Sequence, residues 1–136
     1  NGGALIHCIG KFNDPGPQNA WMEKYIFPGA YTPTLSEQFP SIERAKLFVS
    51  DVEILRLHYA ETLKLWREAF EKNRETIASM YDEKFCRMWE FYLAGCETAF
   101  RHGVLMVFQI QLSKSLSTVP LTRDYISDFE KSHFEI

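Results

Sequence analysis

The sequence lacks most of the features that assign a protein to a class at first sight. Its 136 residues include only three cysteines and no C-x-x-C pair, so neither a disulfide framework nor a zinc knuckle is supported. The formal net charge is −3 and no Lys/Arg cluster occurs, which argues against nucleic acid as a partner. No apolar run has the length of a membrane span, so any membrane contact is expected to be peripheral. We therefore expect a cytoplasmic protein with reduced thiols.

Several motifs that carry chemistry are missing as well. There is no G-x-G-x-x-G or G-x-x-x-x-G-K-[ST] loop for phosphates, and no G-x-S-x-G elbow for a nucleophile. None of the four histidines has another four residues away, as a helical zinc site requires. No metal site is predicted.

What is present indicates a single α/β domain. A hydrophobic fraction of 46% suffices for one core at this length. Residues 4–9 form a short apolar run between glycines, which is typical of a strand covered on both faces, and residues 48–57 look like a second strand. Residues 104–113 alternate at period two, with Met106 and Phe108 on one face and Gln109 on the other. This pattern predicts a third strand.

Helices are predicted between these strands. A capping-box spacing begins a helix over 34–45, another begins at Tyr59, and a third covers 75–102. On the exposed side of the second, Arg67 and Glu71 are spaced for an ion pair. The third carries an apolar stripe of Phe85, Trp89, Tyr92, Cys96 and Phe100. From residue 115 to 136 the sequence is a polar tail.

One histidine stands out because it lies inside the first apolar strand. His7 interrupts the run GGALIHCIG, and on this evidence alone it is a core histidine bonded to a neighbouring carbonyl. Leaving such a group without a partner costs about 1–3 kcal/mol. Its neighbour Cys8 is expected to be a small apolar filler.

A family resemblance gives His7 another role. The sequence resembles the C-terminal half of the cyclopropane-fatty-acyl-phospholipid synthases and mycolic acid cyclopropane synthases over residues 3–114. The stretches that carry the resemblance are, in order, ALIHCIG, W-x-x-KYIFPGAYTP, DVEILRLHYAETLKLW and YDEKFCRMWEFYLAGCETAFR. The implied fold is the C-terminal half of a class I S-adenosylmethionine-dependent methyltransferase. Its three strands would be the fifth, sixth and seventh of the sheet, the last antiparallel, and residues 1–114 would belong to that domain.

The resemblance also implies a reaction and a site. These synthases transfer a methylene group from S-adenosylmethionine to the cis double bond of an unsaturated acyl chain, with bound bicarbonate as the base. The H-x-I and HYAxTL motifs then make His7, Ile9 and Tyr59 the bicarbonate-binding residues. A helix that begins at Tyr59 favours an anion there. The acyl channel would be lined by Phe27, Leu63, Tyr92, Cys96 and Phe100. The implied substrate is an unsaturated acyl phospholipid at the inner face of a bacterial membrane.

The departures from the family pattern shape the remaining expectations. The adenosylmethionine loop, the acidic ribose ligand and a glutamate that binds bicarbonate are expected before residue 1, so this chain has no predicted cofactor-binding residues. We expect a fragment that is inactive alone and forms a homodimer or larger assembly through the strand edge at residues 4–9, which carries no protective charge. A non-catalytic lipid-binding module and a purely structural dimerisation domain stay open as alternatives.

Overall fold

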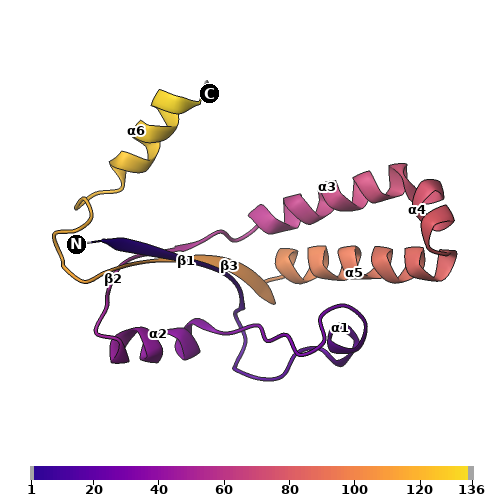
Figure 1. The fold of residues 1–136 in the computed structure, drawn as a ribbon, viewed down its shortest axis with the longest axis horizontal. Coiled ribbons are helices and arrows are strands. Elements are labelled where there is room, and N and C mark those ends of the chain that lie inside the picture. The colour runs from indigo at the N-terminus through magenta and orange to yellow at the C-terminus, as the bar shows by residue number, and fades with distance from the viewer. Residues whose placement is uncertain (1, 135–136) are drawn as a thin grey trace.

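The computed structural model describes residues 2–134 and has a mixed α/β architecture, as predicted (Figure 1). Its strands are β1 (Gly3–Lys11), β2 (Phe48–Ile54) and β3 (Leu105–Ser113). Its helices are α1 (Ala20–Tyr25), α2 (Leu35–Arg44), α3 (His58–Lys72), α4 (Arg74–Met80), α5 (Glu83–Arg101) and α6 (Asp124–His133).

The strands form one sheet in the order β1-β3-β2, with β3 antiparallel to both neighbours. The prediction that the last strand runs antiparallel is therefore confirmed. In this register Gln109 of β3 lies opposite His7 of β1 and Glu53 of β2. The second strand is shorter than the predicted 48–57, because the chain turns after Ile54 to enter α3.

One face of the sheet is apolar and is covered by α2. The side chains of Met106, Phe108, Ile110 and Leu112 alternate along β3 and are buried with Ile42 of α2. The predicted capping box begins this helix, with the Thr34 backbone N–H donating to Glu37 Oε2 at 2.8 Å. Gly10 of β1 packs closely against the ring of Phe108, and a Cβ at this position would lie 2.6 Å from Cε1 of that ring.

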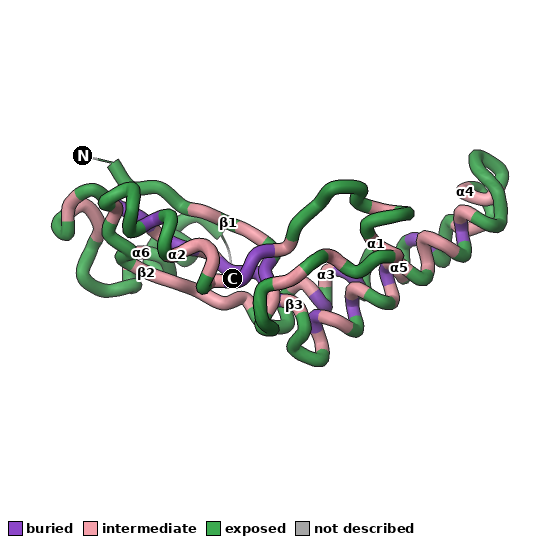
Figure 2. The backbone as a smooth tube through the Cα atoms, turned by 90° about the horizontal axis from the view of Figure 1, so that it is seen from below, coloured by how far each residue is buried: buried purple, intermediate pink, exposed green. Residues whose placement is uncertain are grey.

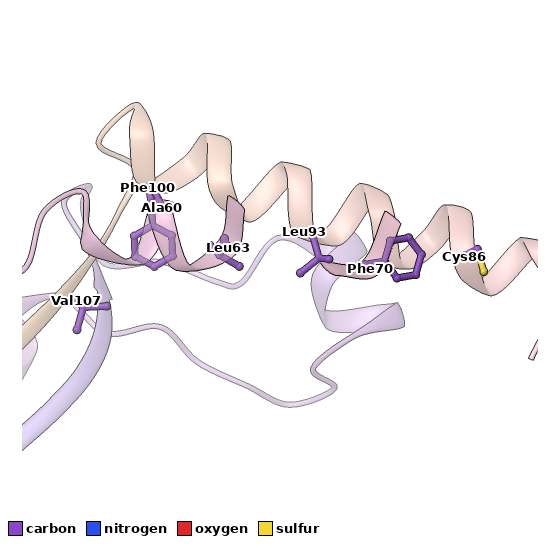
Figure 3. Packing of buried hydrophobic residues seen from close by; sticks show 7 residues of the cluster. All are labelled: Ala60, Leu63, Phe70, Cys86, Leu93, Phe100 and Val107. Atoms are coloured by element: carbon purple, nitrogen blue, oxygen red, sulfur yellow. The ribbon is translucent and has the colours of Figure 1, made fainter. Parts of the chain in front are cut away.

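The antiparallel helix pair α3 and α5 extends from one end of the sheet and meets its other face at Val107 of β3 (Figure 1). Figure 3 shows the apolar cluster that joins this pair to Val107 of β3, in which Leu63 and Leu93 are almost completely buried. Figure 2 shows buried residues along β3 and along these two helices, whereas α1 and α6 have none. The core is therefore divided between the two faces of a narrow sheet.

A buried carboxylate also holds α3 and α5 together. Glu97 of α5 accepts from Nε of Arg67 at 3.1 Å and from Arg101 at 2.9 Å. Burial by itself would raise the pKa of Glu97, but the hydrogen bonds from Arg101 and Arg67 outweigh it and lower this pKa. The predicted pair of Arg67 with Glu71 is wrong, because Arg67 pairs with Glu97 and Glu71 pairs with Arg74. An unpaired carboxylate costs more free energy when it is buried, as Glu97 is, than when it is exposed.

Two further elements differ from the sequence prediction. The expected helix over 75–102 is broken into α4 and α5 at Tyr81 and Asp82, and Asp82 caps α5 by accepting from the Phe85 backbone N–H at 2.6 Å. The predicted polar tail contains α6. Before it, Arg123 pairs with Asp51 and Glu53 of β2 at 2.8 and 2.9 Å, which ties the segment to the sheet.

Candidate functional site: an apolar cavity with a polar end

A cavity of about 1050 Å³ lies between β1, the segment that contains α1, and the helices α3 and α5. We call it the inner cavity. The residues predicted for the bicarbonate site and the acyl channel all line it: His7, Ile9, Phe27, Tyr59, Leu63, Tyr92, Cys96 and Phe100. Residues from four separate parts of the chain thus meet at one place, while their chemical roles stay predictions.

The polar end of the inner cavity begins with His7 on β1. This side chain is exposed, so the structure contradicts the interpretation of His7 as a buried core histidine. Its Nδ1 lies 3.2 Å from Nε2 of Gln109 on the paired strand. An amide nitrogen donates hydrogen bonds, so in this arrangement Nδ1 is the acceptor and Nε2 is left free. His7 can therefore donate from Nε2.

Tyr59 supplies a second donor at this end. It lies in the first turn of α3, where its ring packs at 5.0 Å from Phe100 and 5.9 Å from Trp66, measured between ring centroids. Its hydroxyl has no hydrogen-bond partner within residues 2–134. The residue before α3, Leu57, gives no side-chain cap, so the positive end of this helix stays uncapped. Tyr59 at this helix start and His7 line the same cavity, and donors of this kind suit a small anion.

The predicted channel residues form an apolar part of the wall, although Lys11 and Asp14 also line the inner cavity. Leu63 and Phe100 are buried and belong also to the α3–α5 core, whereas Phe27 is exposed and meets Tyr92 edge-on at 5.9 Å between ring centroids. Burial raises the pKa of the Cys96 thiol to about 11. Burial, with smaller effects of Cys96 and Tyr59, raises the pKa of Tyr92 to about 12. Neutral groups of this kind suit an apolar chain.

The apolar stripe predicted on α5 is only partly correct. Of this stripe, Tyr92, Cys96 and Phe100 line the inner cavity, whereas Phe85 and Trp89 do not. The other buried residues of α5 are outside both the stripe and the cavity lining: Cys86, Leu93 and Glu97. The reason is that α5 has two covered sides, one packed on α3 and one facing the inner cavity. Gly95 lies on the cavity side, where a Cβ would meet no atom within 4 Å.

Sequence reasoning missed three contributors to this site. Gln109 was assigned only a face of its strand, and Trp21 and Phe91 were given no role, although both line the inner cavity. The period-two pattern of β3 does place Gln109 on the polar face. Only the register shows that His7 is its neighbour.

Other kinds of site have no support within the described range. Residues 2–134 hold no group of three or more His, Cys, Asp or Glu side chains that could bind a metal ion. None of the helices in the same range combines the length and the apolar content needed to cross a lipid bilayer.

The fold and the comparisons with known proteins agree on the class. A sheet whose last strand runs antiparallel between two earlier strands, with helices at its faces, is the C-terminal half of a class I methyltransferase fold. The family described as mycolic acid cyclopropane synthetase matches residues 1–110. The chain belongs to this family, as its resemblance predicted.

Individual relatives show how much of such a protein the chain represents. Tuberculostearic acid methyltransferase UfaA1 of Mycobacterium tuberculosis is 46% identical over 91 residues, which is 65% of this chain and 21% of that protein. Cyclopropane-fatty-acyl-phospholipid synthase of Escherichia coli K12 is 31% identical over 112 residues, 82% of this chain and 29% of that protein. The chain thus spans less than a third of the length of these curated relatives.

A solved structure supports the same fold. Mycolic acid cyclopropane synthase CmaA1, complexed with SAH and CTAB, aligns with a TM-score of 0.73 and 25% identity. The alignment covers 81% of this chain and 43% of CmaA1. The predicted fold class is therefore confirmed.

Proposed function

We propose that this chain forms the acyl-binding and base-holding part of an S-adenosylmethionine-dependent enzyme. In this proposal the enzyme transfers a methylene group to the cis double bond of an unsaturated acyl phospholipid. The observation that carries the proposal is the inner cavity, because the free donors of His7 and Tyr59 and the apolar side chains of the predicted channel line one space. The membership in the cyclopropane synthetase family supports the reaction type.

The acyl chain lies along the apolar wall in this mechanism. Leu63 and Phe100 are held by the α3–α5 core, so they give this wall a fixed shape and exclude water from the double bond. Methyl transfer leaves positive charge on the acyl chain, and closing the ring requires the loss of one proton. The base that accepts this proton must therefore sit at the polar end.

Bicarbonate fits the donors at the polar end. When bound it supplies the base, and the residues of this chain hold it in place. The Nε2–H of His7 and the hydroxyl of Tyr59 both lack a partner in residues 2–134 and can donate to its oxygens. Ile9 lines the same cavity. Gln109 holds the His7 ring in the tautomer that donates.

The described residues do not fit S-adenosylmethionine. The connection from β2 to α3 contains no glycine, and that from β1 to α1 contains Gly16 alone, so neither provides a glycine-rich turn for the cofactor. Calorimetric titration of the 136-residue chain with S-adenosylmethionine is expected to give no heat of binding.

The proposal is tested with the protein as its reading frame encodes it. Vesicles of monounsaturated phosphatidylglycerol are incubated with S-adenosylmethionine whose methyl group carries deuterium, and the acyl chains are analysed by mass spectrometry. We expect each converted chain to gain one carbon and keep two deuterons, because the third is lost to the base on ring closure. A gain that keeps three deuterons indicates a methyl product instead. Vesicles of saturated chains serve as the control, and no mass gain contradicts the proposal.

Two further properties belong to the same proposal. Contact with the membrane is peripheral and at its cytoplasmic face. If the protein binds unsaturated vesicles but yields no product, the alternative of a non-catalytic lipid-binding module is favoured.

The free edge of β1 is the proposed site of self-association. Within residues 2–134 this strand pairs with β3 alone, and Leu5 on it is 59% exposed. An apolar, uncharged edge accepts another strand, so the 136-residue chain is expected to form a dimer or larger assembly. Light scattering after size exclusion checks this. Leu5→Lys places a charge at the edge and is expected to shift the chain toward monomer, whereas a wild-type monomer at all concentrations contradicts the proposal.

A further inference from the structure

A second hollow lies on the outside of the molecule, against two of the elements that close the inner cavity. It has a volume of about 570 Å³ and is lined by residues of α1 and of the N-terminal half of α5. In Figure 1, α1 lies beneath the middle of α5. We call it the outer groove. Its lining is dominated by rings and a methionine, namely Trp21, Tyr25, Phe85, Met88 and Phe91. Trp21 and Phe91 also line the inner cavity, so this pair of rings separates the two hollows.

The dividing pair is held loosely. The rings of Trp21 and Phe91 meet edge-on, with 4.8 Å between their centroids, and Phe91 is 60% exposed. The helix that carries Trp21, α1, has six residues and none of them is buried. Few buried contacts mean that such an element opens at low cost in free energy. An acyl chain can therefore pass from the outer groove into the inner cavity when the rings of Trp21 and Phe91 move apart.

Two cations line the outer groove without a partner. Lys84 and Arg87 are three residues apart on α5, hence on one side of the helix, and neither forms an ion pair with any residue from 2 to 134. Four other arginines of the chain do form such pairs: Arg67, Arg74, Arg101 and Arg123.

The nearby acidic groups are already engaged. Glu83 and Glu90 of the same helix both bind Arg74, at 2.7 and 2.9 Å. Asp82 lines the outer groove and accepts from the backbone as the cap of α5. The charges of Lys84 and Arg87 are consequently left to attract an anion from solution.

We propose that the outer groove is the entry and head-group site for an anionic phospholipid. Its phosphate lies at Lys84 and Arg87, and the chain that reacts passes between Trp21 and Phe91 into the inner cavity. This inference rests on the proposed function and places its substrate. A free fatty acid also has an anionic head, but a phospholipid has a second chain, which covers the rings of the outer groove while the first fills the inner cavity.

Vesicle binding tests the head-group site. Co-sedimentation is measured for the protein as encoded, with vesicles of phosphatidylglycerol and of phosphatidylcholine. Lys84→Gln with Arg87→Gln is expected to weaken binding to phosphatidylglycerol roughly tenfold or more, because each cation near an anionic surface contributes attraction. The matched control is Lys64→Gln with Lys72→Gln on α3, which removes two exposed cations outside both hollows. An equal loss in both double variants contradicts the site, as does a loss for oleate micelles without one for phosphatidylglycerol.

The path of the acyl chain is tested by fluorescence. The chain has three tryptophans, Trp21, Trp66 and Trp89. A variant that keeps only Trp21 is expected to be quenched by phosphatidylglycerol with brominated acyl chains, and to lose this quenching when Lys84→Gln and Arg87→Gln are added. The control keeps only Trp66, which lines neither hollow. Quenching of Trp66 but not of Trp21 contradicts the path.

These measurements separate this inference from the proposed function. Binding and quenching need no turnover, so they can succeed in a protein that makes no product. Conversely, cyclopropane formation with unaltered lipid affinity in the Lys84→Gln, Arg87→Gln variant supports the function and contradicts the outer groove.

Discussion

The two faces of the sheet are built in opposite ways. On the face covered by α2, every second residue of β3 is a buried apolar side chain, and Phe108 and Ile110 are inaccessible to solvent. On the other face the row across the three strands is His7, Gln109 and Glu53, and the inner cavity lies beside it. Close packing on one face supplies stability, whereas empty space and unpaired donors on the other cost stability and form the candidate site.

The strongest test of this contrast removes the donors of the open face. In the protein as encoded, His7→Ala and Tyr59→Phe are each expected to lower turnover about 100- to 10,000-fold, the usual effect of losing a positioned base. Affinity for S-adenosylmethionine should hardly change, because neither residue is assigned to it. Steady-state kinetics at saturating bicarbonate measures the effect.

His58→Ala is the matched control for this pair. His58 is exposed at the start of α3 beside Tyr59, but it lines neither hollow. Its variant should keep wild-type turnover within about twofold, since no interaction of the site is lost. Wild-type activity in the His7 and Tyr59 variants contradicts the assignment of the polar end.

The next largest effect is expected on the closed face. Gly10→Ala places a Cβ 2.6 Å from Phe108 and 3.0 Å from the Pro33 carbonyl oxygen, so it should destabilise the fold by about 1–3 kcal/mol. Gly95→Ala is the contrasting change, because its Cβ enters open space on a helix. It should raise stability by up to about 1 kcal/mol through helix propensity. Urea unfolding of both variants measures the change in the free energy of unfolding. Equal changes contradict the contrast between close packing at Gly10 and open space at Gly95.

A smaller effect is expected at the residue that positions His7. Gln109→Leu removes one hydrogen bond, worth about 1 kcal/mol, so kcat should fall about fivefold with KM for the lipid unchanged. Its pH profile should also change, since the tautomer of His7 is no longer fixed. Gln111→Leu is the control, because Gln111 lies on the same face but donates to Tyr125 at 2.9 Å instead. Similar profiles for the two variants argue against a positioning role.

The smallest effect concerns Cys96, a partly buried thiol in the wall of the inner cavity. Burial raises the folded-state pKa of Cys96 from 9.0 to about 11, so the folded chain keeps a proton that the unfolded chain loses. The contribution of this thiol to stability is therefore complete below pH 9 and is lost as the pH rises toward 11. In reducing buffer, Cys96→Ala should show a shallower loss of stability over this interval than the wild type. Identical slopes in urea unfolding contradict a buried neutral thiol at this position.

Local patterns in the sequence determined a large part of this molecule. The alternation along β3, the capping box before α2 and the start of α3 at Tyr59 all depend on residues a few positions apart. Hydrogen bonding and side-chain direction within one element fix such features, which is why they were predicted. Short motifs also carried the family resemblance. The residues that this resemblance implied for the bicarbonate site and the acyl channel all line the inner cavity.

Contacts between distant residues were decided only by the tertiary structure. The pairing of His7 with Gln109 depends on strand register. Arg67 binds Glu97 and not Glu71, because a buried carboxylate without a partner is costly in free energy. Likewise, α1 meets α5 through Trp21 and Phe91, which no spacing in the sequence relates. The sequence by itself therefore determined the three strands, the helices α2 and α3 and the family, and it named the residues of the predicted site. The tertiary structure decided their partners and the two hollows, because these depend on how separate elements pack.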